Sequence, residues 1–300
     1  MSSLNANIRI IMYKQTILNW LILITLSFIW GSSFILMKRG LEGFTYIEVG
    51  FFRLIVAFFV LIPFLKSSLK NIKKYHVIPL LIVSIIGTVI PAVLFAFSQT
   101  YLNSASAGML SALTPMFTFI IGIVLFHVKW EKMHIIGVLI GFIGSYILLL
   151  PSSINIIETK YSLVILLATI CYALSINTIK SKLFALSALD IAVLSSFFSF
   201  LIPFLYLINS EPIGILNNIY VNINAFSYIM ILGIVCTSGA IILFNYLIRS
   251  TSALFGASTT YLIPIFAVSW GLIDGELIKN HEIVGILIIL LGVFIMNYRR

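Results

Sequence analysis

Arg53 is the residue of this 300-residue chain with the most distinctive chemistry, because it is the one basic residue that lies well inside a long apolar stretch. Its planar guanidinium group could bind a carboxylate through two parallel hydrogen bonds. The alternative is that the long side chain extends outward to water or pairs with Glu48 or Glu42. The sequence leaves both interpretations open.

Aromatic and neutral hydrogen-bonding residues also lie inside the apolar stretches, whereas all nine carboxylates lie at their ends or between them. Ring faces and neutral polar groups suit the binding of small organic molecules. A single Ser or Thr can instead satisfy a carbonyl of its own helix, so the clustering of polar residues in six stretches is the stronger signal. With Arg53, the candidate binding residues are Trp30, Ser32, Phe34, Phe95, Asn103, Ser111, Pro115, Tyr172, Asn177, Asn245, Tyr246, Tyr261, Pro264 and Trp270.

Motifs for covalent chemistry are missing from the sequence, which contains no GxSxG, HExxH, P-loop, GxGxxG or CxxC pattern. We therefore predict no catalytic residue, no metal site, no cofactor and no enzyme activity. The alternative is an enzyme that acts on lipid-linked substrates, for which Asp274, Glu276, His281 and Glu282 form the one candidate cluster. Solvation of a loop explains these four residues more simply.

The elements that must position these residues are membrane-spanning helices. Hydrophobic residues make up 61% of the chain and charged residues 9%, against about 25% charged residues in a soluble domain. Apolar runs of about 20 residues are long enough to cross a bilayer as helices. We predict an all-α polytopic membrane protein of ten transmembrane helices, at about 17–37, 46–66, 77–97, 102–126, 133–151, 161–179, 188–209, 226–247, 252–273 and 281–298.

The basic residues predict the orientation. If both termini are cytoplasmic, 13 of the 18 Lys and Arg residues lie on the cytoplasmic side, four lie outside (Lys38, Arg39, Lys160 and Lys279), and Arg53 lies within a span. This bias follows the positive-inside rule. We therefore predict a multi-pass protein of the cytoplasmic (inner) membrane with both termini cytoplasmic. The net charge of +9 then indicates topology and attraction to anionic lipid rather than a nucleic-acid partner.

The chain contains an internal repeat. The segment 58–65 returns 140 residues later, at 198–205, and Leu94-Phe95 returns 149 residues later as Leu243-Phe244. Pro115 and Pro264 are also 149 residues apart. We predict two five-helix repeats, residues 1–152 and 153–300, which are inverted relative to each other because each holds an odd number of spans. Inverted repeats allow alternating access to a site near the bilayer midplane, and the alternative is a duplication that forms a static bundle.

The fifth and tenth predicted spans carry glycines and few polar side chains. Gly137 and Gly141 form a GxxxG pattern, Gly144 follows it, and Gly285 and Gly292 lie in the tenth span. Small residues let helices approach closely. We interpret these spans as scaffold, with a homodimer contact as a further hypothesis.

Several short motifs resemble those of one transporter family. Trp30-Gly-Ser-Ser-Phe34 followed by Arg53, the proline-bearing segments 111–115 and 261–264, and Gly275-Glu276 followed by Gly285 and Gly292 occur in order along the chain. In this order they resemble an EamA-type member of the drug/metabolite transporter superfamily. The resemblance implies ten helices in two inverted repeats around a central cavity lined by spans one, three, four, six, eight and nine, and it implies export of amino acids, related metabolites or drugs. His127 stands where the second repeat has Glu276, so any role of Glu276 does not extend to His127.

These observations together predict a secondary membrane transporter. It would move small organic solutes across the cytoplasmic membrane by alternating access, as an exporter, with the solute and the lipid bilayer as its partners. The alternative is a non-transporting membrane scaffold or interaction protein that uses the bundle to hold partners.

Overall fold

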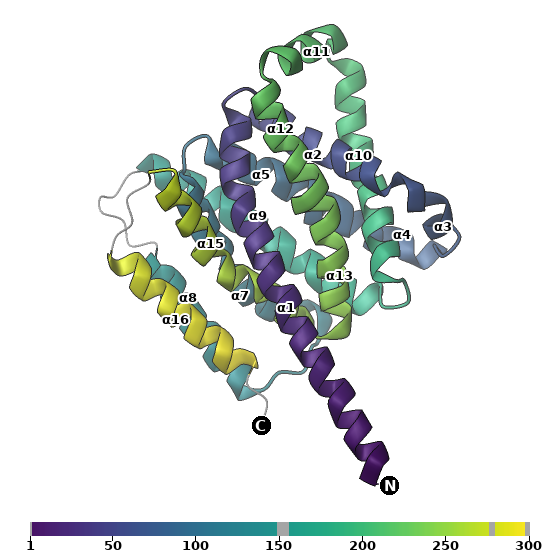
Figure 1. Cartoon of the computed structure of the whole chain (residues 1–300), viewed down its shortest axis with the longest axis vertical. Coiled ribbons are helices and arrows are strands. Elements are labelled where there is room, and N and C mark those ends of the chain that lie inside the picture. The colour runs from purple at the N-terminus through teal and green to yellow at the C-terminus, as the bar shows by residue number, and fades with distance from the viewer. Residues whose placement is uncertain (1, 149–155, 276–279, 298–300) are drawn as a thin grey trace.

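The structure is a computed structural model that describes residues 2–148, 156–275 and 280–297. Within these ranges every regular element is a helix, which confirms the all-α prediction (Figure 1). The α-helices are α1 (Ser2–Leu41), α2 (Tyr46–Leu61), α3 (Leu65–Leu69), α4 (Lys74–Leu81), α5 (Ile90–Gln99), α6 (Ser104–Ser111), α7 (Thr114–Phe126), α8 (Lys132–Leu148), α9 (Ile156–Lys182), α10 (Ala188–Asn209), α11 (Pro212–Val221), α12 (Ile223–Ile231), α13 (Ala240–Ser250), α14 (Ala253–Ala257), α15 (Thr259–Ile273) and α16 (Asn280–Asn297). The short helix η1 (Ile62–Phe64) is a 3₁₀-helix, and η2 (Ile82–Val89) and η3 (Leu232–Gly239) are π-helices.

Eight of the ten predicted spans are long and apolar enough in the described structure to cross a membrane. They cover 13–41, 46–69, 74–99, 104–126, 160–182, 188–209, 223–250 and 253–273. The other two predicted spans coincide with α8 and α16, whose apolar stretches, at 132–144 and 283–292, are shorter. The total of ten spans therefore stays a prediction.

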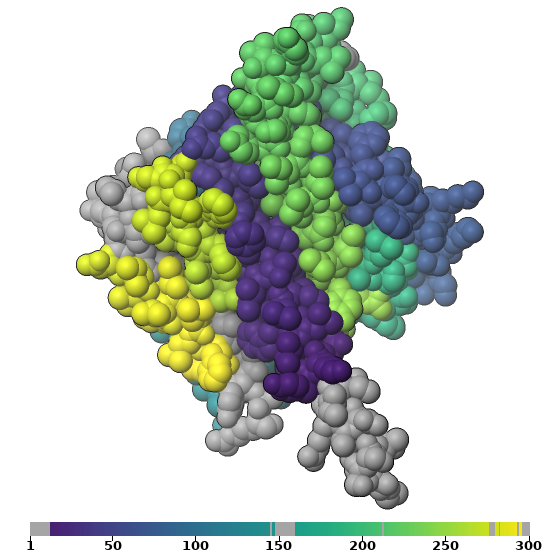
Figure 2. All heavy atoms as spheres, viewed as in Figure 1, coloured from purple at the N-terminus to yellow at the C-terminus, as the bar shows by residue number. Residues whose placement is uncertain are grey.

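Helix α1 runs along one face of the molecule (Figure 2). It lies between α15 and α16 on one side and α12 and α13 on the other (Figure 2). The N-terminal end of α1 and the C-terminal end of α16 lie at the same end of the molecule (Figure 1). The helix α2 starts shortly after α1 ends, and α3, which follows it, lies away from that connection (Figure 1).

The helices α2 and α10 begin in the same way. Thr45 and Glu48 form a capping box at the start of α2, and Ser187 and Asp190 form one at the start of α10. In each, the hydroxyl oxygen and the carboxylate satisfy backbone N–H groups that have no partner within the helix. The two caps are 142 residues apart, so they give matching positions in the two halves of the chain.

Four spans are interrupted at matching places. The third and eighth spans contain the π-helices η2 and η3, and the fourth and ninth spans break after α6 and α14. Pro115 occupies the first turn of α7, where its missing N–H costs nothing, so it begins a helix rather than kinks one. Pro264 lies within α15 and is buried.

The glycines of α8 and α16 bring these two helices into contact. A Cβ atom added at Gly292 would lie 2.6 Å from Gly141 N, and one added at Gly144 would lie 2.8 Å from Ile289 N. Only glycine permits such an approach of two helix backbones. The small residues are thus used inside the chain and do not support the predicted homodimer, which stays a prediction.

Two predictions fall outside the described residues. The boundary between residues 152 and 153 lies in the first gap, and Glu276, named in the resemblance and in the enzyme alternative, lies in the second. The residue ranges of the two predicted repeats therefore remain predictions.

Candidate functional site

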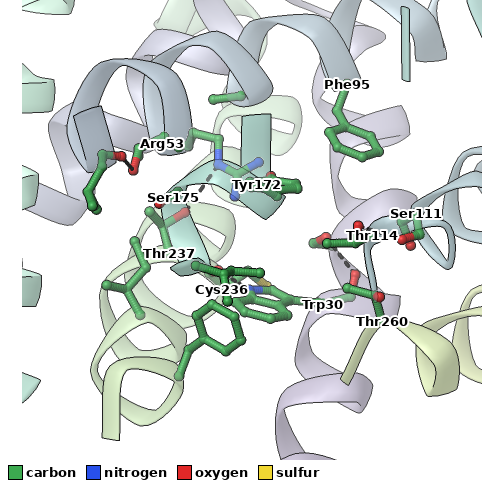
Figure 3. Close-up of a pocket in the computed structure, with 18 of the residues that line it drawn as sticks. Trp30, Arg53, Phe95, Ser111, Thr114, Tyr172, Ser175, Cys236, Thr237 and Thr260 are labelled. Carbon is green, nitrogen blue, oxygen red and sulfur yellow. Dashed lines mark hydrogen bonds between the residues drawn. The ribbon is translucent and has the colours of Figure 1, made fainter. Parts of the chain in front are cut away.

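A cavity of about 130 Å³ lies at the centre of the bundle (Figure 3). It is lined by residues of α1, α2, η2, α5, α6, α7, α9, α10, η3, α13 and α15. An apolar cavity of about 150 Å³ is large enough to bind benzene, so this one fits a small organic molecule. The spans that contribute include all six in which the sequence gathers polar residues.

The residues that line the cavity are related in pairs along the chain. Eleven pairs, or 22 of the 25 lining residues, are separated by 142 or 149 residues. Those separated by 142 are Trp30/Tyr172, Ser33/Ser175, Phe34/Ile176, Met37/Ile179 and Arg53/Ser195, and those separated by 149 are Gly87/Cys236, Thr88/Thr237, Ala92/Ile241, Phe95/Phe244, Ser111/Thr260 and Thr114/Ile263. The two halves of the chain therefore present matching positions to one cavity.

One face of α1 and one face of α9 form two walls of the cavity. Trp30, Ser33, Phe34 and Met37 follow the spacing i, i+3, i+4 and i+7, which places them on one side of α1. Their four counterparts in α9 have the same spacing. The ring of Phe34 meets that of Phe95 edge to face, with ring centroids 5.7 Å apart.

The π-helices place hydroxyl groups at the cavity. Thr88 Oγ1 donates a hydrogen bond to Val83 O at 3.0 Å, and Thr237 Oγ1 donates one to Leu232 O at 2.8 Å. Each hydroxyl thus satisfies a carbonyl five residues earlier, in the wide turn of a π-helix. Trp30 Nε1 donates to the carbonyl of Cys236 in η3 at 3.0 Å, which fixes the indole ring at the cavity wall. π-helical turns of this kind are often found at functional sites.

Arg53 is the only charged residue among the described residues that line the cavity. Its Nε donates to Thr237 Oγ1 at 3.1 Å. Neither carboxylate considered in the sequence pairs with it, because Glu42 accepts from Arg39 and Glu48 accepts from the backbone and hydroxyl of Thr45. The structure thus places Arg53 at the cavity, and the alternative in which Arg53 pairs with Glu48 or Glu42 is not observed.

Seven of the fifteen residues predicted from the sequence line the cavity: Trp30, Phe34, Arg53, Phe95, Ser111, Tyr172 and Asn245. Phe95 and Tyr172 stack with ring centroids 5.8 Å apart, and Tyr172 lies next to Arg53 (Figure 3). Ser111 lies with Thr114 and Thr260 in another part of the cavity wall (Figure 3). Their role in binding stays a prediction.

Four of the remaining predicted residues make polar contacts elsewhere. Ser32 accepts a hydrogen bond from Trp270 Nε1 at 2.7 Å, on the side of α1 that faces α15. Asn103 caps α6 by accepting from Ser106 N, and Tyr246 accepts from Gln15 Nε2. Helix rotation, which the sequence does not define, turns these side chains away from the cavity.

Asn177, Tyr261, Pro115 and Pro264 are buried in helix contacts. Asn177 Nδ2 donates to Thr118 O and to Ala173 O, both at 2.9 Å, and so joins α9 to α7. Tyr261 is 1% exposed and packs on Gly141 of α8. The two prolines lie beside the lining residues Thr114 and Ile263 without reaching the cavity themselves.

Several lining residues were absent from the predicted set, among them Ser33, Thr88, Ser175, Thr237 and Phe244. Two signals together could have identified them. One is the helical spacing within a span, and the other is the constant offset between the halves. A residue that satisfies both lies on the same face of a repeated helix as an established candidate such as Trp30.

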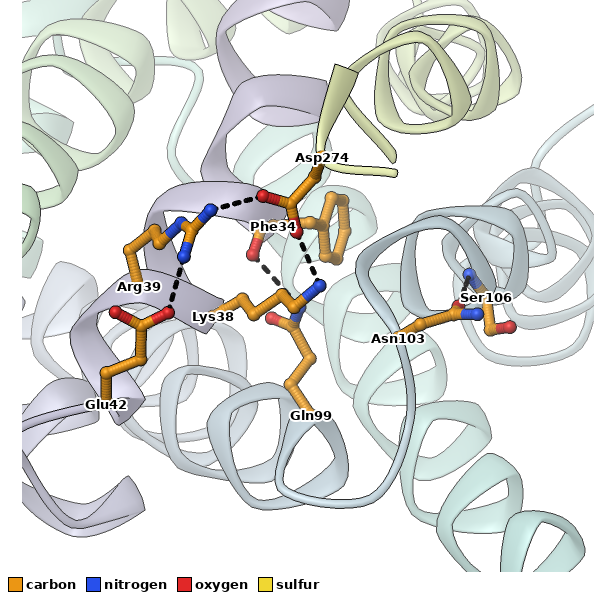
Figure 4. Close-up of polar contacts among 8 residues, drawn as sticks. All are labelled: Phe34, Lys38, Arg39, Glu42, Gln99, Asn103, Ser106 and Asp274. Carbon is orange, nitrogen blue, oxygen red and sulfur yellow. Dashed lines mark hydrogen bonds and ion pairs between the residues drawn. The ribbon is translucent and has the colours of Figure 1, made fainter. Parts of the chain in front are cut away.

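An ion-pair cluster of Lys38, Arg39, Glu42 and Asp274 lies just beyond one end of the cavity (Figure 4). Lys38 Nζ donates to Asp274 Oδ2 at 2.6 Å, and Arg39 bridges Asp274 and Glu42. The hydrogen bond from Lys38, followed by the charges of Lys38 and Arg39, holds the pKa of Asp274 below its ordinary value. The cluster joins the end of α1 to the end of α15, directly after the lining residue Met37.

A second polar contact joins the halves at the opposite end. Asn71 Nδ2 donates to Asp190 Oδ2 at 3.1 Å, between the turn after α3 and the start of α10. On the same side, Lys180 Nζ donates to three carbonyls at the end of α13 and beyond it: Ile248, Arg249 and Thr251. These donors satisfy carbonyls at a helix end that have no partner within the helix.

Comparisons with known proteins agree with this architecture. The sequence model of the EamA-like transporter family matches the chain twice, at residues 18–150 and 159–298. An Escherichia coli K12 protein named as the uncharacterized inner membrane transporter YedA is 25% identical over 92% of this chain and 89% of its own length. An uncharacterized transporter of Archaeoglobus fulgidus is 22% identical over 94% of this chain and 99% of its own length. A protein of known crystal structure shares the fold, with a TM-score of 0.68 at 14% identity over 92% of this chain and 95% of its own.

The two matches of the family model together cover most of the chain, and the helices that they cover surround a cavity with polar and aromatic walls. The chain therefore belongs to the EamA-like transporter family and is a membrane transporter.

Proposed function

We propose that the protein moves small organic solutes across the cytoplasmic (inner) membrane by alternating access, and that the central cavity is the solute site. The observation that carries this proposal is the pairing of 22 lining residues at two constant offsets. Two halves that present matching walls can exchange roles, so that one state opens to one side and the other state opens to the other side. The relative named as an inner membrane transporter supports the location.

We further propose that α8 and α16 are the fifth and tenth spans, and that the two halves are inverted repeats. The matching caps, π-helices and helix breaks support the repeats. The common end of the two termini and the 13 basic residues on that side support a cytoplasmic location for both termini.

The polar contacts between the halves support alternating access. Lys38 and Asp274 join them at one end of the cavity, and Asn71 and Asp190 join them at the other. A transport cycle would break one of these contacts at a time. Export as the direction rests on the resemblance to the EamA-type exporters.

Flux into proteoliposomes tests the function. A panel of labelled amino acids and other small metabolites would be assayed with and without a pH gradient. Ala92→Trp fills the cavity, whereas Leu139→Trp adds the same side chain on the exposed face of α8. We expect flux of at least one solute in the wild type, loss of flux with Ala92→Trp, and retained flux with Leu139→Trp. No flux of any solute, or equal flux in both variants, would contradict the proposal and favour a scaffold.

Cysteine labelling tests the topology. In a chain whose two native cysteines are replaced by alanine, Lys70→Cys and Tyr220→Cys place exposed thiols before α4 and in α11. We expect an impermeant maleimide to label position 70 from the cytoplasmic side and position 220 from the outer side. Labelling of both positions from one side would refute the proposed arrangement.

A further inference from the structure

We propose that Arg53 binds a carboxylate of the transported solute, so that the substrates are small organic acids or zwitterions such as amino acids. This inference rests on the proposed function and specifies the substrate class of the same cavity.

The first argument is charge. Arg53 carries the only charge among the described residues that line the cavity, and none of the described carboxylates forms an ion pair with it. A charge in a membrane span that lacks a counter-ion is costly. A solute that brings one negative charge into the cavity supplies that counter-ion.

The second argument is the orientation of the guanidinium group. Gly233 lets η3 pack closely on α2, since a Cβ atom at Gly233 would lie 2.9 Å from Arg53 O. This contact brings Thr237 to Arg53, where Thr237 Oγ1 accepts from Nε and donates its own proton to Leu232 O. Nε is therefore occupied, and the two terminal nitrogens remain to form the parallel pair of hydrogen bonds that a carboxylate accepts. Figure 3 shows this end of the side chain beside Tyr172, inside the cavity.

The third argument is asymmetry. Among the eleven pairs, Arg53/Ser195 is the only one whose members differ in charge. Both residues are the eighth after a helix cap, Thr45 or Ser187. Each faces a π-helix whose threonine, Thr237 or Thr88, donates to a carbonyl five residues earlier. The cavity therefore has one cationic side and one neutral polar side, which sets a single orientation for a solute with one carboxylate.

The fourth argument distinguishes an organic acid from an inorganic anion. Tyr172 lies next to Arg53 (Figure 3), and the rings of Phe95, Trp30 and Phe244 also line the cavity. Ring faces suit an apolar or aromatic body. A single cation balances a carboxylate, whereas a phosphate dianion would retain one uncompensated charge. The site thus suits a carboxylate attached to a small organic group.

Matched pairs of acids and amides test the proposal on the full-length chain in nanodiscs. The probes are benzoate with benzamide, propionate with propionamide, and L-valine with L-valinamide, with chloride as the inorganic anion. Binding is measured by calorimetry and by the thermal shift. We expect the acid of at least one pair to bind, and Arg53→Gln to weaken its binding about 10- to 100-fold, because a charge-assisted hydrogen-bond pair is lost. Arg53→Lys, which keeps the positive charge but loses the planar pair of N–H donors, should weaken binding to an intermediate extent.

The threonine pair provides a matched control. Thr237→Val and Thr88→Val each remove one hydroxyl that donates to a π-helix carbonyl. Only Thr237→Val removes the partner of Arg53, so we expect it alone to lower the ratio of acid to amide affinity. A decrease in stability without a change in this ratio would indicate a structural role. This variant also keeps the test decisive if Arg53→Gln fails to fold.

Three outcomes would overturn the inference: acids and amides bind equally, Arg53→Gln leaves the ratio unchanged, or chloride alone binds. Flux of an uncharged solute in the proteoliposome assay, together with any of these outcomes, would retain the transport function and reject the carboxylate site. Absence of flux for every solute would instead reject the transport function.

Discussion

Lys38 Nζ donates a hydrogen bond to Asp274 Oδ2 at 2.6 Å and so joins the end of α1 to the end of α15, 236 residues later in the chain. The Asp274 side chain is 12% exposed, and Phe34 and Met37, which lie four residues and one residue before Lys38, line the cavity. The contact thus lies directly over the site and connects the two halves of the bundle. In the proposed alternating-access cycle, its strength would set how readily this end of the cavity opens.

Asp274→Asn should make opening at this end easier. The change removes a charge that interacts with both Lys38 and Arg39, and we expect it to cost about 1 kcal/mol because the pair is partly solvated. Cys236 lines the cavity and reports on access. In a Cys171→Ala chain, an impermeant thiol reagent added on the side of Asp274 should modify Cys236 faster than in the parent.

Glu42→Gln is the matched control for this prediction. Among the residues that the structure describes, Glu42 forms an ion pair with Arg39 alone, and its side chain is 56% exposed, so its loss should leave the labelling rate of Cys236 nearly unchanged. Equal acceleration by Glu42→Gln and Asp274→Asn would show that general loss of surface charge, rather than the Lys38–Asp274 contact, controls access.

The contribution of Asp274 to stability should depend on pH. Its pKa is lowered, chiefly by the hydrogen bond from Lys38, so the contribution is complete above the ordinary carboxyl pKa and is lost as the pH falls through the lowered value. We expect the difference in melting temperature between the wild type and Asp274→Asn to stay constant from neutral to mildly acidic pH and to vanish only in strong acid. A difference that disappears near pH 6 would mean that another group is responsible.

Ser32→Ala and Ser33→Ala should separate stability from binding. Ser32 accepts from Trp270 outside the cavity, so its loss should lower stability by about 1 kcal/mol and leave solute affinity unchanged. Ser33 is the next residue and lines the cavity, so its loss should change affinity. Thermal melting and binding of the same solute measure both quantities. A weaker affinity for Ser32→Ala alone would show that helix rotation in α1 differs from the one described.

Gly292→Ala should destabilise the protein by about 1–3 kcal/mol, because the added methyl group would overlap the backbone of α8 at Gly141. Gly214 in α11 is the control, since the nearest atom to an added Cβ there is 3.8 Å away. Gly214→Ala should be neutral or slightly stabilising, as alanine favours helices over glycine. Melting temperatures in detergent that fall equally for both changes would contradict the close contact of α8 and α16.

The fold was more predictable from the sequence than the site. Apolar runs indicate helices, and repeated segments indicate that the helices are duplicated. Both the length of an apolar run and the order of the segments can be read directly from the linear sequence. Eight spans, the helical class and the family follow from them. Which side chains face the cavity depends on the rotation of each helix about its axis. A span that has apolar residues on every side gives no sequence pattern that defines this rotation. Ser32 and Ser33 are neighbours of the same type, and only Ser33 lines the cavity.

Local irregularities were the least predictable features. The π-helices η2 and η3 carry no distinctive residue pattern, yet they place Thr88 and Thr237 at the cavity. The two prolines mark segments near the cavity but do not contact it. Pro115 and Pro264 are buried next to lining residues without reaching the cavity. The repeat offset of 142 residues, combined with the helical spacing of Trp30, Ser33, Phe34 and Met37, identifies the matching lining residues of α9.

The lone cation of Arg53 also has an electrical consequence. A charge that crosses the whole membrane potential changes in energy by about 2.3 kcal/mol for every 100 mV. The empty protein carries this charge within α2, so any displacement of α2 relative to the bilayer responds to voltage in proportion to the part of the field that Arg53 crosses. A bound carboxylate cancels the charge. With an organic acid whose only charge is this carboxylate, voltage would then act on the return of the empty carrier and leave the loaded step nearly unaffected, whereas with a zwitterion it would act on both steps.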